Sequence, residues 1–182
     1  MKHEITPKTE FAVLGGGCFW CLEAIYRRLP GILSVSSGYA GGVRSHPSYE
    51  EVCTGTTGHA EVIRLEFNSL QVSYHEILEL FWRVHDPTTR NQQGADIGTQ
   101  YRSIILYHNK EQRRIAESSK KTAQPLFRDP IVTEIAPLEN FYPAEPHHQQ
   151  FYEKHPNQNY NQVVIRPKLQ RLKQEGILPR EA

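Results

Sequence analysis

The sequence has almost no net charge, no long apolar run and few cysteines. Its 21 Lys and Arg residues nearly balance its 20 Asp and Glu residues, so the formal net charge is +1. A chain without a basic excess has no strong electrostatic attraction for nucleic acid or for an anionic membrane. Its apolar runs are far shorter than the ~20 residues that cross a membrane, and its first residues lack a signal-peptide core. We therefore expect neither a nucleic-acid partner nor a membrane partner.

Cysteine occurs only three times, as Cys18, Cys21 and Cys53. A small, odd number of cysteines does not provide a disulfide framework and is typical of thiol chemistry in a reducing compartment. We therefore expect a cytoplasmic protein. Zinc would need two further ligands at a matching spacing, and no second compact pair follows. The adjacent His147 and His148 would point to different faces of a helix, so we expect no metal site.

The length of the chain predicts one domain over residues 1–182, acting as a monomer, with a polar arm at residues 1–10. Apolar and alternating runs predict strands at residues 11–14, 32–39, 61–67, 101–107 and 131–138. Apolar residues at helical spacing and capping residues predict helices that begin near Cys18, Ser73, Asn109 and Pro167. Because strands and helices are mixed in order, we expect an α/β or α+β sandwich around one sheet.

Four further stretches are polar or rich in turn residues. Residues 88–100 predict a long loop, and loops of this length usually have a function or are mobile. Residues 48–58 predict a short helix or turn followed by a loop. In the tail, residues 145–153 could form a helix and residues 156–162 a loop.

Three glycines immediately precede Cys18, between an apolar strand and an amphipathic helix. This order places Cys18 at a helix N-terminus, where free backbone N–H groups and the helix dipole favour an anion. We therefore expect the pKa of its thiol to lie below the usual ~8.5. The alternative is a buried, inert cysteine in a tight turn. The glycines, the helix start and the nearby Cys21 favour a reactive thiol.

Cys18 and Cys21 form a Cys-x-x-Cys pair at the start of this predicted helix. Residues three apart are neighbours on a helix, so a disulfide between them is within reach. The pair by itself is compatible with redox exchange, with half of a zinc site or with no function. Phe19 and Trp20 lie between the two cysteines and cannot both face the helix core. We expect at least one of them to form an exposed aromatic wall beside the thiol, suited to a thioether group.

Glu61 begins an apolar strand. An inward-facing carboxyl group would lose water, its pKa would rise, and it could donate a proton at neutral pH. The residue pattern alone favours the other orientation, with Glu61 facing solvent. Tyr49, Asp96 and Tyr101 lie near glycine-rich loops, but each is also ordinary in a turn, loop or strand.

Several motifs, in this order along the chain, resemble those of the A-type peptide methionine sulfoxide reductases. They are Gly17-Cys18-Phe19-Trp20, Pro47 to Cys53, Thr57 to Glu61, His85-Asp86-Pro87, Gln93 to Ser103 and His148-Gln149-Gln150. The resemblance extends from about residue 11 to about residue 170. It implies a two-layer α/β sandwich, related to the ferredoxin-like plait, with an irregular C-terminal tail. It also implies reduction of the S epimer of methionine sulfoxide, free or in proteins, with no bound cofactor and with thioredoxin as the external reductant.

The resemblance also implies roles for single residues. Cys18 matches the nucleophile, and Glu61 matches the acid that protonates the sulfoxide oxygen. Phe19 and Trp20 match the wall that holds the substrate methyl group. The remaining matches hold that oxygen or orient the substrate: Tyr49, Tyr101 and Asp96.

The sequence departs from a common family pattern in its recycling cysteines. Many members carry them in the C-terminal tail, but no cysteine follows Cys53 here, and Asn161 follows the tail tyrosine. Cys21 is therefore the first candidate for the resolving cysteine, Cys53 the second, and no internal partner the third. Two other functions stay open: a general dithiol–disulfide oxidoreductase that uses Cys18 and Cys21, and a zinc-binding or peptide-binding module.

Overall fold

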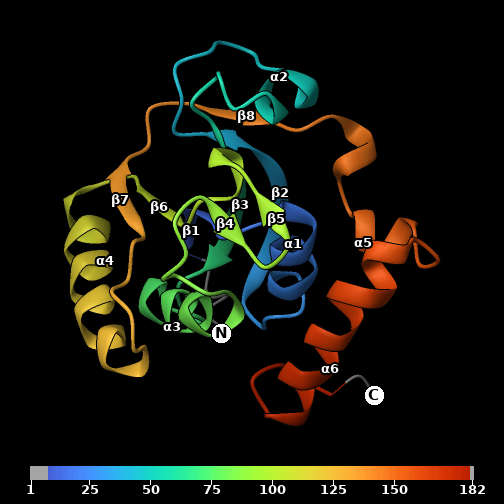
Figure 1. Cartoon of the computed structure of the whole chain (residues 1–182). Coiled ribbons are helices and arrows are strands. Elements are labelled where there is room, and N and C mark those ends of the chain that lie inside the picture. Colours follow the sequence, from blue (N-terminus) through green and yellow to red (C-terminus); the bar gives the residue numbers. More distant parts are fainter. Residues whose placement is uncertain (1–7, 181–182) are drawn as a thin grey trace, which may run out of the picture.

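The computed structural model describes residues 8–180 as a mixed α/β fold around a curled six-stranded sheet (Figure 1). The strands are β1 Thr9–Gly15, β2 Ile32–Ala40, β3 Ala60–Asn68, β6 Ile104–Tyr107, β7 Glu134–Pro137 and β8 Phe141–Pro143. Their order across the sheet is β7-β6-β1-β3-β2-β8. Neighbouring strands are antiparallel except β6 and β7, which run parallel. A separate two-stranded hairpin, β4 Gln92–Gln93 and β5 Asp96–Ile97, lies within the long polar loop.

The main helices pack on one face of the sheet. They are α1 Phe19–Tyr26, α3 Tyr74–Val84 and α4 Lys110–Ala123. Ala12 and Leu14 of β1 face the large core formed with these helices, whereas Val13 belongs to a smaller cluster on the opposite face. This alternation follows from the two-residue period of a strand and places the chain after β1 at the start of α1.

The predicted helix starts at Ser73 and Asn109 are confirmed by their hydrogen bonds. The Ser73 hydroxyl accepts from the Glu76 N–H at 3.1 Å, and the Glu76 carboxylate accepts from the Ser73 N–H at 2.7 Å. Asn109 caps α4 by accepting from the Gln112 N–H at 2.9 Å. Each cap satisfies an N–H group that the first helical turn leaves free.

Some predicted bounds are wrong. Residues 1–7 of the polar arm lie outside the described residues, and Thr9 and Glu10 are not an arm but pair with Asn68 and Phe67 of β3. The strand expected over 101–107 begins only at Ile104, after a 3-10 turn at Thr99–Tyr101, and the strand expected over 131–138 is shorter. β8 was not expected, because three residues with two aromatics and a proline carry no strand periodicity.

The C-terminal tail, from residue 145 onward, contains more and shorter helical segments than the sequence predicts. The helix expected over 145–153 is a 3-10 turn at Pro146–His148 followed by α5 Phe151–Lys154. The expected loop over 156–162 runs into a π-helical segment, Asn161–Ile165, and then α6 Arg166–Gln174. Figure 1 shows α5 and α6, in orange and red, on the same side of the molecule as α1. The tail therefore returns to the helix that carries the two neighbouring cysteines.

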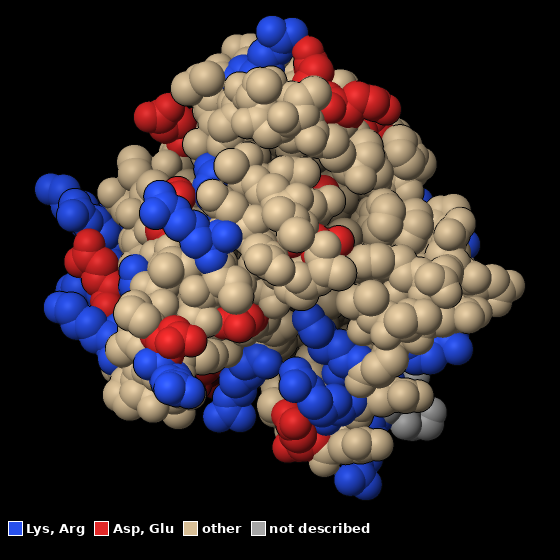
Figure 2. Space-filling model, in the orientation of Figure 1, with Lys and Arg blue, Asp and Glu red and all other residues tan. Residues whose placement is uncertain are grey.

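Charged residues are distributed as the balanced composition suggests. Lys and Arg lie interspersed with Asp and Glu over the face that Figure 2 shows, and its centre is mostly uncharged. None of the helices within residues 8–180 has both the length and the apolar character that a membrane crossing requires.

Candidate active site

Cys18 lies between β1 and α1, as the glycine turn predicts. It occupies the N-cap position of α1, and Gly17 before it has a φ of +94°. A Cβ on Gly17 would lie 2.7 Å from the Gln93 side chain, so both backbone angle and space require glycine there. The turn therefore fixes the direction in which the chain enters the helix.

The pKa of Cys18 lies well above the ordinary thiol value, which contradicts the sequence expectation. Burial raises it first, because the thiolate loses its water, and the negative charge of Glu61 raises it further. Hydrogen bonds from the Trp20 N–H and the Tyr160 hydroxyl act in the opposite direction. The helix-start effect is present, but desolvation outweighs it.

Glu61 is buried on β3 with 1% of its surface exposed, so the solvent-facing interpretation of this residue is wrong. Its carboxylate accepts a hydrogen bond from the Phe19 N–H at 3.0 Å, one residue after Cys18. Burial raises the pKa of Glu61 to about 8. The carboxyl group is therefore largely protonated at neutral pH and can donate a proton beside the thiol.

Tyr49, Tyr101 and Asp96 come from three separate elements and gather near this carboxyl group. Tyr49 begins α2, Tyr49–Cys53, and Asp96 belongs to β5. Burial and the charge of Glu61 raise the pKa of both tyrosines, and Asp96 raises that of Glu61. The two phenols therefore stay neutral and can donate hydrogen bonds. Electrostatic coupling of Tyr101 to Cys18 places it near the thiol as well.

Phe19 and Trp20, the two aromatic residues after Cys18, are buried to different extents. Phe19 is completely buried, so only the half-buried Trp20 can form the expected wall. One face of Trp20 stacks on Phe151 of the tail, with ring centroids 3.6 Å apart and an interplanar angle of 6°. The Trp20 indole N–H donates to His148 Nδ1 at 3.2 Å. The tail therefore holds the indole in place and leaves less of it exposed than the sequence predicts.

A cavity of about 230 Å³ opens beside the thiol. Its lining includes Gly16, Cys18, Cys21, Asp96, Tyr160 and Lys168. The Tyr160 hydroxyl donates to Asp96 Oδ2 at 3.0 Å, and it also lies close enough to the Cys18 sulfur to lower the pKa of that thiol. Tyr160 and Lys168 were not predicted as site residues, because only the fold brings the tail to α1.

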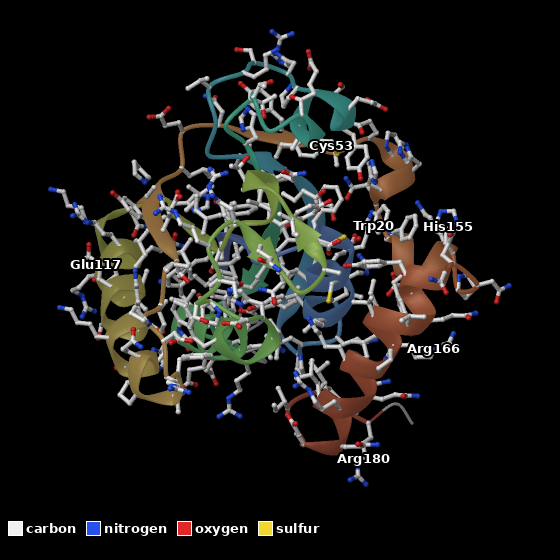
Figure 3. All side chains as sticks on the ribbon, viewed as in Figure 1. Trp20, Cys53, Glu117, His155, Arg166 and Arg180 are labelled. Carbon is white, nitrogen blue, oxygen red and sulfur yellow. The ribbon has the colours of Figure 1, made fainter. Side chains whose placement is uncertain are left out.

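Cys21 and Cys53 lie on different sides of this site. Cys21 is buried on α1 and lines the same cavity as Cys18. Cys53 is exposed at the end of α2, where it accepts a hydrogen bond from the Tyr49 hydroxyl. Figure 3 shows Cys53 above Trp20, whereas Arg166 at the start of α6 lies below it.

Glu145, His147 and His148 place ligand-type atoms within 4.8 Å of one another. Nδ1 of His148 accepts a hydrogen bond from the Trp20 indole, whereas its buried Nε2 lies 3.4 Å from the Glu145 carboxylate without completing a hydrogen bond. A neutral imidazole that accepts at Nδ1 carries its proton on Nε2 and offers that nitrogen as a donor. The hydrogen bond at Nδ1 therefore orients the indole of Trp20.

Comparison with known protein families gives a match to the family described as peptide methionine sulfoxide reductase, over residues 10–179. The chain belongs to this family. The resemblance drawn from the sequence motifs is thereby confirmed, and the protein is an oxidoreductase. A peptide methionine sulfoxide reductase MsrA of Saccharolobus solfataricus is 55% identical over 162 residues, which cover 89% of this chain and 92% of that protein. One of Leptospira borgpetersenii is 54% identical, covering 92% of this chain and 96% of that protein.

Solved structures of this family show the same architecture. The reduced form of Mxr1 from Saccharomyces cerevisiae matches with a TM-score of 0.80 and 38% identity, over 83% of this chain and 88% of that one. The same yeast protein in complex with Trx2 matches with a TM-score of 0.58 and 25% identity, over 83% and 89%. The described fold is thus closer to the reduced relative than to the complex.

Proposed function

We propose that this protein reduces the S epimer of methionine sulfoxide, free or in proteins, to methionine, with Cys18 as nucleophile and Glu61 as acid. The single observation that carries this proposal is the buried Glu61 carboxyl group, hydrogen-bonded to the Phe19 N–H at 3.0 Å and protonated near neutral pH. Sulfoxide oxygen leaves sulfur only after it gains a proton. A dithiol exchange needs no such acid.

The first half of the reaction, in which the sulfoxide oxidises Cys18, takes up no proton from solvent. Glu61 gives its proton to the sulfoxide oxygen while the sulfur of Cys18 attacks the sulfoxide sulfur, and the proton of the thiol replaces the one that Glu61 lost. The sulfur–oxygen bond of the substrate then breaks and its oxygen adds as hydroxide to the Cys18 sulfur. This step breaks the new sulfur–sulfur bond, so methionine leaves and Cys18 carries the oxygen as a sulfenic acid. The thiol is oxidised and the sulfoxide is reduced by the same two electrons. A neutral resting thiol is therefore compatible with the raised pKa of Cys18.

The remaining site residues are proposed to bind the substrate. The neutral hydroxyl groups of Tyr49 and Tyr101 hold the sulfoxide oxygen, because their raised pKa values keep them as donors beside Glu61. Asp96 orients the substrate. Trp20 forms the apolar wall against which the substrate methyl group packs, and the buried Phe19 lies behind it.

The second half of the reaction is proposed to form a disulfide between Cys18 and Cys21. Cys18 is the N-cap of α1, Cys21 lies on its first turn, and both line one cavity. This supports Cys21 over Cys53, which is exposed and does not line that cavity. An external dithiol of the thioredoxin type then reopens the disulfide, and the yeast relative Mxr1 in complex with Trx2 supports this partner. We propose a cytoplasmic monomer that needs no bound cofactor.

The proposed relationship to the ferredoxin-like plait rests on topology. The central strands lie in the order β6-β1-β3-β2, all antiparallel neighbours, with α1 between β1 and β2 and α3 between β3 and β6. This order supports a split βαβ arrangement of the kind that such folds contain.

Cysteine variants test the proposal. Cys18→Ser should abolish methionine release even with excess dithiothreitol, because the attacking thiol is the one at the helix start beside the Glu61 carboxyl group. Cys21→Ser should still release about one methionine per chain and then stall with thioredoxin. Cys53→Ser should turn over normally and is the matched control.

Disulfide mapping after one turnover gives the decisive comparison. The expected product joins Cys18 to Cys21. A Cys18–Cys53 disulfide, or stalling of Cys53→Ser but not Cys21→Ser, would show that α2 supplies the resolving thiol. Efficient reduction of insulin disulfides by the unmodified protein, unchanged in Glu61→Gln and without any sulfoxide reduction in either protein, would support the dithiol oxidoreductase instead.

A further inference from the structure

Lys168 lies where the C-terminal helix α6 reaches the cysteines of α1. Its ammonium group donates to the carbonyl oxygen of Val84, the last residue of α3, at 2.9 Å. The same side chain lines the 230 Å³ cavity together with Cys18 and Cys21. It also lies within hydrogen-bonding reach of the Cys21 sulfur. One cation therefore connects the end of one helix to a thiol on another.

The contact with Val84 alone would be an ordinary helix cap. Carbonyl groups at a helix C-terminus lack partners within the helix, and a cation there stabilises the helix. An ammonium group has three N–H donors, however, and Val84 uses only one of them. The anchored Lys168 therefore has donors left to direct at the sulfur of Cys21.

Cys21 is a buried thiol in this cavity, and a nearby cation stabilises its ionised form. It is 5% exposed, and burial raises its pKa because the thiolate loses its water. The charge and hydrogen bond of Lys168 lower that pKa, whereas Asp96 of β5 raises it. The other titratable groups that face the pair are those of Cys18, Tyr160 and His85. The pKa of His85 is lowered to about 4 by burial, so this ring is neutral and does not replace the cation.

We propose that Lys168 is a positioning residue for recycling, an inference that rests on the function proposed above. Its ammonium group, anchored on Val84, lies beside the Cys21 sulfur and favours the ionised form in which that sulfur attacks oxidised Cys18. The attack forms the sulfur–sulfur bond and breaks the sulfur–oxygen bond of the sulfenic acid. Hydroxide leaves and takes up the proton that Cys21 lost, so the products are the disulfide and one water. The Cys21 sulfur is oxidised and the Cys18 sulfur is reduced.

A single-cysteine protein measures the effect on Cys21 without any turnover. In the Cys18→Ser, Cys53→Ser background, the rate at which iodoacetamide alkylates Cys21 is followed against pH by mass spectrometry. Lys168→Gln removes the charge but keeps an amide N–H for Val84. It should shift the midpoint of the profile upward by about one pH unit, since an opposite charge at this range shifts a pKa by ~1–3 units.

Two further variants separate electrostatics from structure. Lys168→Arg keeps the charge and should restore most of the midpoint. Arg171→Gln removes an exposed cation from the same helix and should leave the midpoint unchanged. An unshifted midpoint in Lys168→Gln, with or without a lower melting temperature, would show that Lys168 only caps α3 and would overturn the inference.

Single turnover with methionine sulfoxide distinguishes this inference from the proposed function. In the protein with all three cysteines, Lys168→Gln should release methionine as fast as the unmodified protein. It should then form the disulfide about threefold to tenfold more slowly at pH 7. A higher pKa lowers the ionised fraction of Cys21, and the greater nucleophilicity of a more basic thiolate offsets that loss only in part. Absence of methionine release from the unmodified protein would overturn the proposed function, while the alkylation profile would still decide the role of Lys168.

Discussion

Two acids in this site share one region of buried space, the thiol of Cys18 and the carboxyl group of Glu61. Each makes ionisation of the other harder, since burial disfavours both charges and the ionised Glu61 raises the pKa of Cys18. The resting site therefore holds two protons near neutral pH. The proposed reaction starts from this state. Glu61 gives its proton to the sulfoxide oxygen and receives the proton of the Cys18 thiol, so no proton from solvent is needed.

Glu61→Gln should slow the sulfoxide reduction step by roughly 10²–10⁴, the usual span for a general acid. The single-turnover rate of the unmodified protein should fall as the pH rises through about 8, because the Glu61 carboxyl group then loses its proton. The glutamine variant should lack this fall. Rapid-quench measurement of methionine between pH 6 and 10 checks both results.

Glu66→Gln is the matched control for that experiment. Glu66 lies on the same strand but accepts a hydrogen bond from the exposed Ser34 hydroxyl at 2.9 Å. Its substitution should leave the rate and the pH profile unchanged. A Glu61→Gln protein with an unaltered single-turnover rate would mean that another group, such as Tyr49 or Tyr101, supplies the proton.

The sequence predicts the residues of this site unevenly. Cys18 is located by purely local signals, the glycines and the helix start. Local signals do not locate Glu61. The alternating sequence of β3 predicts one solvent-exposed face, whereas residues 60–63 are all buried, because both faces of the sheet are packed there. Only the family resemblance assigned the role of acid to Glu61. Neither the local residue pattern nor the resemblance indicated Tyr160 or Lys168 as site residues.

At the scale of the elements, α1 depends on the tail that returns to it. The Glu23 carboxylate on α1 accepts from the Gln150 N–H at 2.9 and 3.0 Å, and Phe151 stacks on Trp20 at 3.6 Å. Gln150 has a φ of +55°, an unusual conformation that these contacts hold in place. The tail was hard to predict because long-range contacts of this kind, and not local periodicity, determine its breaks.

Phe151→Ala should loosen α5 from α1. Loss of the stacked ring should lower the free energy of unfolding by about 1–3 kcal/mol, below the usual cost for a fully buried Phe because this ring is only half-buried. Hydrogen exchange should increase over residues 146–165 more than in the sheet. Thermal unfolding and exchange mass spectrometry measure the two effects.

Val163→Ala serves as the control, since Val163 lies in the same tail with 64% of its surface exposed. It should change neither quantity appreciably. Equal exchange in Phe151→Ala and the unmodified protein would show that other contacts, such as that of Glu23, suffice to hold the tail.

At the scale of the whole molecule, the sheet order determines which distant segments meet. β1 lies between β3 and β6, so the turn that carries Cys18 lies beside the strand that carries Glu61. The strand and helix pattern predicted the mixed fold and most element positions, because local propensity and packing agree there. The meeting of α1, β3, the β4–β5 hairpin and the tail is a property of the assembled fold, and it produces the site.

The measurement that tests this account most directly is the stoichiometry of one turnover without a reductant. The Cys21→Ser, Cys53→Ser protein receives excess S-methionine sulfoxide, and both free methionine and the mass of each peptide are measured. The account predicts about one methionine per chain and one added oxygen atom on the peptide that contains Cys18, with no release from the R epimer. No methionine release, or equal release after Cys18→Ser, would contradict it.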